Sequence, residues 1–126
     1  LEHLADPLVG LKECRRVLRP DGYICLTTVQ YWHTHHYPND YYRYTKHGLI
    51  YLCKKAGFTI EKIWSHGGPF LVVFHGIEIN LPNILRTIFS ILFFRAADFL
   101  DWRFFKHYDR RQNSDSVGWS LIAKKT

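Results

Sequence analysis

The sequence contains no methionine and only three cysteines, Cys14, Cys25 and Cys53, which are widely spaced and form no CxxC pair. An odd number of isolated cysteines argues against a disulfide framework and against a zinc site. We therefore expect all three to be small core residues of a protein from a reducing compartment, the cytoplasm. Because a native chain starts with methionine, we also expect sequence upstream of Leu1.

Two further absences limit the function. The glycines are scattered, and none forms the glycine-rich loop that lets a nucleotide-type cofactor approach the backbone closely. Hydrophobic residues make up 47% of the chain, enough for a folded core, yet no stretch reaches the roughly 18 uncharged apolar residues of a membrane-spanning helix. We therefore expect residues 1–126 to form one domain or part of one.

The formal net charge is +6, and the basic residues stand in short, separated clusters. A nucleic-acid surface would show a denser basic stripe interleaved with polar side chains, so we predict no nucleic-acid partner. Two interpretations stay open: the charges are scattered solvated faces, or they weakly attract an anionic partner or membrane surface.

The first half of the chain alternates between helix and strand patterns. Asp6-Pro7 is a helix start, because aspartate caps free amides and proline fits the first helical position. Residues 23–28 then form a nearly unbroken apolar run, which is typical of a parallel strand buried on both faces. After a polar and aromatic loop over 29–45, Thr45 caps a second helix that ends at Gly57. Residues 58–64 follow as a second strand, and this order predicts an α/β fold with a parallel sheet.

Residues 69–106 are strongly apolar, and we predict two helices there, inserted before a last strand over 117–124. Alternation in that strand is typical of a solvent-tolerant, antiparallel addition. The inserted helices have three open interpretations: packing over the sheet, a hydrophobic acceptor pocket or membrane-surface face, and a dimer interface. Membrane contact or dimer formation would use residues 70–105, with Trp102, Phe104 and Phe105 as the side chains of interest.

Several motifs in order resemble one enzyme family. Leu1-Glu2-His3-Leu4, Asp6-Pro7 and the run from Glu13 to Tyr23 are similar to the stretch after the fourth strand of class I S-adenosylmethionine-dependent methyltransferases. Asp21 stands there in place of the usual first glycine. Asp40-Tyr41-Tyr42-Arg43-Tyr44-Thr45, followed by Gly48-Leu49 and Ala56-Gly57-Phe58, resembles a signature of one branch, the type 11/12-like methyltransferases. Residues 117–125 resemble the last antiparallel strand of the family.

The resemblance covers about residues 1–66 and 116–125, and it implies a Rossmann-like sheet of seven strands with the seventh antiparallel. This chain would supply the last three strands, as the C-terminal part of a single methyltransferase domain. It implies S-adenosylmethionine as cofactor and a small-molecule or lipid-like acceptor. The family's glycine-rich loop and ribose-binding carboxylate are not among residues 1–126, so we expect these residues alone to be marginally stable and inactive. The alternative is a catalytically inactive methyltransferase-like module that binds a partner or a membrane surface.

His3 is the candidate catalytic residue, because it follows the inferred fourth strand and would face cofactor and acceptor. Glu2 and His3 are the candidate cofactor-binding residues. His3 could act as a general base or pocket wall, or it could simply hydrogen-bond near a helix start. In related quinone O-methyltransferases a Glu-His pair at this place helps to hold a divalent metal, a third interpretation. We predict no metal here, since no carboxylate or cysteine has convincing ligand spacing to the loop histidines His33, His35 and His36.

The candidate acceptor-binding residues lie in the loop after the first strand. Tyr31 and Trp32 belong to its aromatic stretch, which is either a lid over the acceptor or a surface loop with titrating histidines. Asp40, Tyr41, Arg43 and Tyr44 belong to the family signature. Arg43 could clamp a carboxylate or phosphate of the acceptor, or it could pair with Asp40 and fix the loop. The tyrosines are candidates for packing as well as for binding.

Overall fold

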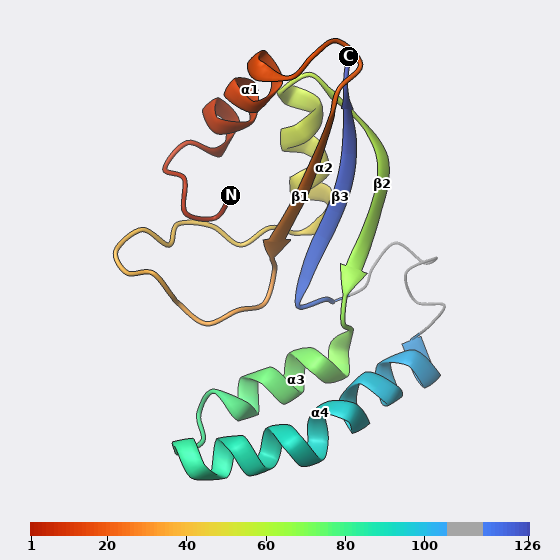
Figure 1. Cartoon of the computed structure of the whole chain (residues 1–126). Helices are drawn as coiled ribbons and strands as arrows, with labels where there is room; N and C mark the ends of the chain where they lie inside the picture. Colours follow the sequence, from red (N-terminus) through yellow and green to blue (C-terminus); the bar gives the residue numbers. More distant parts are fainter. Residues whose placement is uncertain (106–114) are drawn as a thin grey trace. The chain divides into compact units, whose positions relative to one another are not determined.

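The structure, a computed structural model, describes residues 1–105 and 115–126 and is drawn in Figure 1. The last position of the predicted insertion, residue 106, lies outside the described residues, and the side chain of Phe105 is not described. The chain divides into two compact units. The first unit comprises residues 1–30, 34–64 and 118–126, and the second unit comprises residues 31–33 and 65–117.

The first unit contains two helices, and each is capped at its start by a side chain that lies next to it in the sequence. Helix α1 (Pro7–Val17) starts where Asp6 accepts a hydrogen bond from the Val9 amide at 3.0 Å, with proline in the first turn. Helix α2 (Lys46–Lys55) starts where Thr45 Oγ1 accepts from the Gly48 amide at 3.1 Å. Gly57, with φ of +90°, takes the chain out of α2 in the left-handed conformation that glycine tolerates best. Both predicted helices are confirmed.

The sheet has three strands in the order β1-β3-β2, from β1 (Tyr23–Val29), β2 (Phe58–His66) and β3 (Gly118–Lys125). β1 and β3 pair antiparallel, from Tyr23 opposite Lys124 to Val29 opposite Gly118. The antiparallel last strand is therefore confirmed. β1 and β2 point the same way in Figure 1, but β3 lies between them and pairs antiparallel with β1, so the sheet is antiparallel and the expected parallel sheet is wrong.

The core of the first unit is built on the last strand. Trp119, Leu121 and Ala123 of β3 are buried and pack with Leu11 of α1 and Leu49 of α2, among others. The solvent-tolerant character expected for this strand is wrong, because Ser120 on the other face of β3 is buried as well. The alternation in its sequence therefore does not mark an exposed face.

β1, in contrast, is less buried than its apolar sequence predicted. Its residues alternate between exposed and partly buried, and Tyr23 and Cys25 are exposed. Burial on both faces would need a covering layer on each side, and the described residues supply a packed core on one. Cys14 is also exposed, so only Cys53 is the core cysteine that all three were expected to be. Burial raises the pKa of the Cys53 thiol to about 11.

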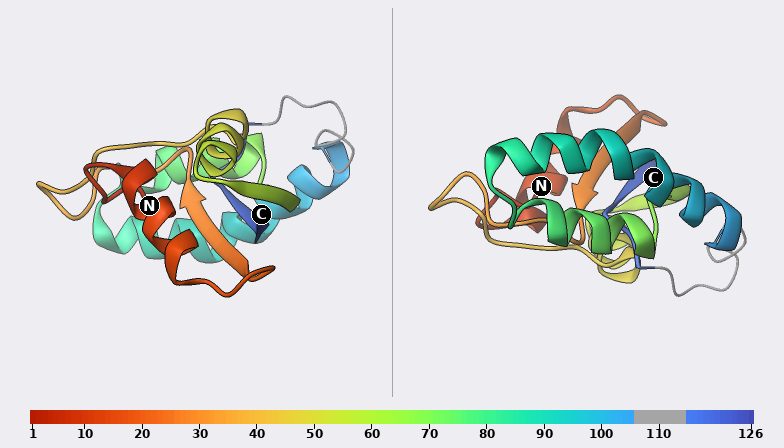
Figure 2. Two further views of the ribbon diagram at one scale, coloured as in Figure 1. Left: turned by 90° about the horizontal axis from the view of Figure 1, so that it is seen from above. Right: turned by 90° about the horizontal axis from the view of Figure 1, so that it is seen from below.

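The second unit is a helical hairpin of α3 (Pro69–Glu78) and α4 (Asn83–Phe105), which run side by side in Figures 1 and 2. The two helices predicted within 69–106 are confirmed. Phe74 of α3 stacks on Phe89 of α4, with ring centroids 5.0 Å apart, and Leu71 and Ala97 complete the buried cluster. Among the described residues, no helix combines the length and the apolarity needed to cross a bilayer.

Candidate functional site

The segment before α1 and the loop after β1 meet at the carboxyl end of β1, within the first unit. Thr28 Oγ1 donates to Glu2 Oε2 at 2.8 Å, and the Tyr41 amide donates to the Glu2 carbonyl oxygen at 3.0 Å. The Tyr44 amide donates to the Val29 carbonyl oxygen at 2.9 Å, which fixes the far end of the loop. Residues far apart in the sequence are thereby held together at one edge of the sheet.

Glu2 is ionised at neutral pH in this setting. Burial raises the pKa of its carboxyl group, but hydrogen bonds from its own backbone, from Thr28 and from the amino group of Leu1 together hold the pKa below its usual value. Its Oε1 atom lies 3.8 Å from Nε2 of His3. Glu2 therefore places a fixed negative charge beside the His3 ring.

His3 makes the local hydrogen bond that one of its interpretations expected. Its Nδ1 lies 2.7 Å from the Asn39 carbonyl oxygen, and because a carbonyl only accepts, Nδ1 carries the proton. In a neutral ring Nε2 is then the unprotonated nitrogen, and it is this atom that faces Glu2. The side chain is 34% exposed, so solvent reaches it. Nε2 is therefore the ring nitrogen that can take a proton when the His3 ring is neutral.

Glu2, His3 and His35 each offer one possible metal-ligand atom, and these atoms all lie within 4.8 Å of one another. The His3 and His35 rings meet edge to face, with centroids 4.7 Å apart. These three residues could hold a divalent ion. The sequence spacing did not reveal the combination because Glu2 stands 33 positions before His35 and is brought to it by the loop.

Asp40 and Arg43 form a bidentate ion pair, with Nη1–Oδ1 and Nη2–Oδ2 distances of 2.6 and 2.7 Å. Asp40, whose side chain is 3% exposed, also accepts from the His35 amide at 2.9 Å. The hydrogen bonds from Arg43 hold the pKa of Asp40 well below its usual range. Arg43 thus makes the pairing that one of its two interpretations expected, and this pair orients the segment carrying His35.

The remaining predicted acceptor-binding residues fall into different places. Tyr44 is buried in the core of the first unit, and burial raises the pKa of its hydroxyl. Tyr41 is exposed and donates to Asn39 Oδ1 at 2.9 Å. Tyr31 and Trp32 belong to the second unit. The predicted set is therefore divided between the two units.

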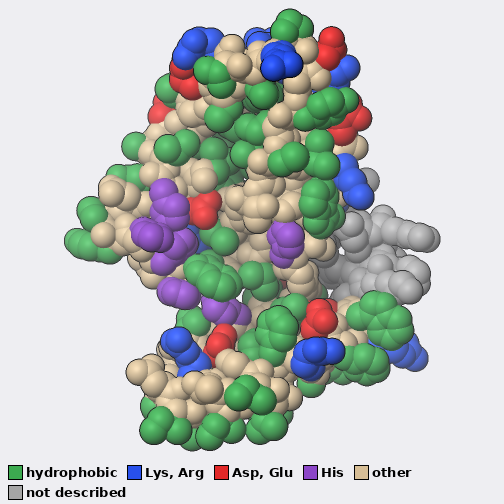
Figure 3. All heavy atoms as spheres, in the orientation of Figure 1, with side chains coloured by type: hydrophobic (Ala, Val, Ile, Leu, Met, Phe, Trp, Pro, Cys, Tyr) green, Lys and Arg blue, Asp and Glu red, His purple; other side chains and the backbone are tan. Residues whose placement is uncertain are grey.

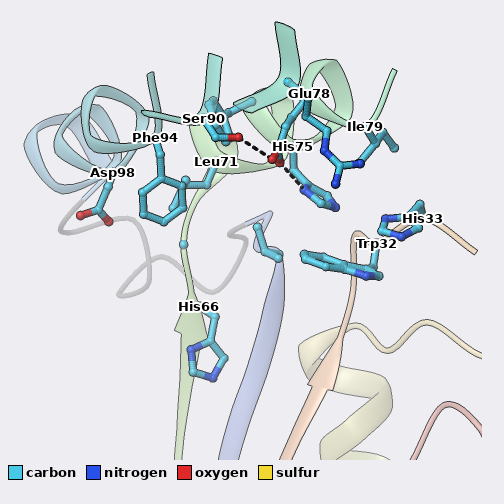
Figure 4. A pocket seen from close by; sticks show the side chains of 14 residues that line it. Trp32, His33, His66, Leu71, His75, Glu78, Ile79, Ser90, Phe94 and Asp98 are labelled. Atoms are coloured by element: carbon cyan, nitrogen blue, oxygen red, sulfur yellow. Dashed lines mark hydrogen bonds and ion pairs between the residues drawn. The ribbon is translucent and has the colours of Figure 1, made fainter. Parts of the chain in front are cut away.

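The second unit contains a cavity of about 650 Å³. α3 and α4 provide most of its lining, and Figure 4 shows His75, Glu78 and Ser90 joined by hydrogen bonds on one wall. The Trp32 ring stacks on the His75 ring, with centroids 3.9 Å apart and planes 18° from parallel. Sequence reasoning missed this wall. The signal was available, since His75 and Glu78 stand three residues apart on one helix in an otherwise apolar stretch.

The sequence matches no family model and no curated protein. A function for this chain therefore has to be inferred from its own motifs and geometry.

Proposed function

We propose that this protein is an S-adenosylmethionine-dependent methyltransferase acting on a small-molecule or lipid-like acceptor, and that residues 1–126 belong to the acceptor side of its catalytic domain. The observation that carries the proposal is the anchoring of the loop after β1 onto Glu2 and His3. Ligands of open α/β sheets bind beyond the carboxyl ends of strands. Two motifs of the resemblance, separate in sequence, are tied together at that end of β1.

The chemistry of these side chains suits such a reaction. S-adenosylmethionine supplies an activated methyl group on a cationic sulfonium. The ionised carboxylate of Glu2 is compatible with a cation nearby, because its low pKa keeps it negative. His3 Nε2 is the atom that could take a proton from the acceptor, while its Nδ1–H stays on Asn39. Asp40 and Arg43 act as positioning residues that hold the loop.

The proposal is tested on the natural chain, recovered by tagging the gene at its 3′ end. The purified protein is incubated with S-adenosylmethionine labelled in the methyl group and with small-molecule and lipid extracts of the source cells. Transfer of label to one extract fraction is expected. A purified natural chain that neither binds S-adenosylmethionine nor transfers label would refute the proposal.

The role of His3 is tested by two substitutions in that chain. His3→Ala removes both ring nitrogens, whereas His3→Gln keeps a donor for the Asn39 carbonyl oxygen but cannot take a proton. If His3 is the base, turnover falls by about 10²–10⁴-fold in both variants while cofactor affinity changes little. If His3 only fixes the loop, His3→Gln should retain most of the turnover.

A second candidate function rests on a specific surface of α4. Hydrophobic side chains gather along this helix in Figure 3. One stripe of exposed side chains, with helical spacing, consists of Ile84, Ile88, Ile91, Leu92, Phe99 and Trp102. Arg95 lies within the stripe, with Arg103 at one border and Asp98 at the other, so two of these three charges are positive. Apolar rows with basic residues among them match a membrane surface of anionic lipid.

This second candidate is a peripheral contact with an anionic lipid surface, and vesicle sedimentation tests it. The natural chain should sediment with vesicles containing phosphatidylserine, less with pure phosphatidylcholine, and less at high salt. Leu92→Glu, within the stripe, should abolish sedimentation, while Asn83→Glu, exposed on another side of α4, should not. Equal sedimentation of the two variants would contradict a membrane role for this surface.

A further inference from the structure

The cavity of the second unit has the size of a small-molecule site. Its volume of about 650 Å³ falls within the range of pockets that enclose organic ligands, roughly 300–1,000 Å³. Aromatic rings form much of its lining, including Trp32, Phe74 and Phe94. In Figure 4 the rings of Trp32, His33 and His75 gather at one side, and Phe94 and Asp98 lie at the other. Such walls favour a flat, apolar ligand body.

The polar wall fixes the tautomer of a neutral His75 ring. Glu78 is ionised, because the hydrogen bond from Ser90 lowers the pKa of its carboxyl group, against the effect of burial and with help from His75. Ser90 Oγ lies 2.6 Å from Glu78 Oε1, and His75 Nδ1 lies 3.3 Å from Oε2. A carboxylate only accepts hydrogen bonds, so Nδ1 of His75 carries the proton. In the neutral ring Nε2 is then an acceptor.

This acceptor has no partner. Nε2 of His75 is buried and makes no hydrogen bond with any of the described residues. Buried polar atoms are nearly always hydrogen-bonded, so an exception on the wall of a cavity points to a group that the protein receives there. A donor is required, and a hydroxyl on an aromatic ring supplies one together with the flat body that the cavity favours.

The charges of the lining select against an acidic ligand. Glu78 and Asp98 are acidic and Arg86 is basic, so the ionised lining residues carry one net negative charge. A carboxylate or phosphate would meet this charge in a partly enclosed space, where repulsion is poorly screened. A neutral ligand has no such cost.

We infer that the second unit binds a neutral, planar aromatic molecule through a hydroxyl group that donates a hydrogen bond to Nε2 of His75. Trp32, Phe74 and Phe94 enclose the ring, and Glu78 sets the tautomer in which Nε2 of a neutral His75 accepts. His75 is a binding residue in this site. The inference does not depend on methyl transfer, since it concerns ligand binding by the second unit alone.

Two probes that differ in one donor test the inference on the natural chain. 2-Naphthol carries a hydroxyl group, and 2-methoxynaphthalene has the same ring with the hydroxyl proton replaced by a methyl group. Binding is measured by quenching of protein fluorescence without S-adenosylmethionine. A site built to accept a hydrogen bond rejects an analogue that lacks the donor, so 2-naphthol should bind about tenfold more tightly or better.

His75→Phe is the critical variant. It keeps a flat ring against Trp32 and removes both nitrogens, so the affinity ratio of the two probes should fall to about one. This ratio does not depend on the folded fraction of the variant, which guards against a loss of stability. The matched control is His47→Phe, on the exposed side of α2 in the first unit, which should keep the wild-type ratio.

Three results would overturn the inference: no binding of either probe, a ratio near one in the wild type, or an unchanged ratio in His75→Phe. None of them bears on methyl transfer, because no methyl donor is present. Conversely, tight binding of 2-naphthol by a protein that transfers no methyl group would uphold the inference and leave the proposed activity refuted by its own assay.

Discussion

Asp101 caps a helix from a distance, and its removal should destabilise the second unit strongly. α3 begins after Gly68, which has no side chain with which to cap it. The Asp101 carboxylate, on α4, takes this role: Oδ2 accepts from the amides of Gly68 and Leu71, and Oδ1 accepts from that of Phe70, each at 2.9 Å. The residue is 8% exposed, so water does not readily replace these bonds.

The magnitude follows from what each amide would lose in Asp101→Ala. The hydrogen bonds of Gly68 and Leu71 are buried, and an unsatisfied buried donor costs about 1–3 kcal/mol. The Phe70 amide is only partly buried and can turn to water. Two unsatisfied donors therefore give about 4 kcal/mol. Asp101→Asn keeps one acceptor oxygen and should cost about half as much, roughly 2 kcal/mol.

Hydrogen exchange at the Phe70 and Leu71 amides is the direct assay, because it reports opening of the first turn of α3. A loss of about 4 kcal/mol corresponds to exchange about a thousandfold faster, limited by the stability of the unit. Asp98→Ala is the matched control, since it removes the same charge from an exposed position one turn earlier on α4. If both variants accelerate exchange equally, the capping argument is wrong.

Three further predictions concern the first unit. The buried Cys53, whose pKa burial raises to about 11, should resist alkylation at pH 8 until unfolding, while the two exposed cysteines react at once; fast labelling of all three would contradict this. Because Arg43 holds the pKa of Asp40 below its usual range, the ionised Asp40 stabilises the folded protein. This stabilisation is complete above the pKa of Asp40 in the unfolded chain, about 3.9, and is lost as the pH falls through its lower pKa in the folded protein. Urea unfolding should therefore show wild type and Asp40→Asn converging only at strongly acidic pH, and a difference independent of pH would refute this. Gly57→Ala should lower the unfolding free energy by about 1–3 kcal/mol, since φ is +90° there, whereas Gly76→Ala, inside α3 with open space around it, should not.

The helices were predictable because their signals are local. Asp6 caps an amide three positions ahead of it, and Thr45 does the same for Gly48. Gly57 ends α2 through a conformation that depends on its own backbone. None of these features requires knowledge of another element. A single sequence therefore suffices to place both helices of the first unit.

The burial of the strands was not predictable in this way. The apolar run over β1 favoured a strand buried on both faces, and the alternating pattern over β3 favoured a solvent-tolerant strand. In the structure β3 is the more deeply buried of the two strands. Trp119 is buried because its face of β3 packs with residues of α1 and α2, and Cys25 is exposed because the described residues form a packed core on only one side of β1. Position within a sheet is decided by pairing over long sequence separations, which the pattern of one strand does not contain.

The two candidate sites show the same division between local and distant information. The Asp40 and Arg43 pair was foreseen as one alternative because three residues separate the partners, whereas the approach of His35 to Glu2 was not. On α3, the spacing of His75 and Glu78 is equally local, yet by itself it indicates only a surface pair.

The His75 and Glu78 pair becomes a candidate binding site because other segments of the chain cover it. Ser90 of α4 occupies one oxygen of Glu78, and Trp32 covers the imidazole ring, so the second nitrogen of His75 is buried without a hydrogen-bond partner among the residues that the structure describes. On an open helix face the same nitrogen would be bound to water and would call for no ligand. The capacity to bind a hydroxyl group therefore comes from α4 and residues 31–33 as much as from α3. A substitution at Trp32 should for this reason weaken 2-naphthol binding, even though it removes no hydrogen-bonding partner of the ligand.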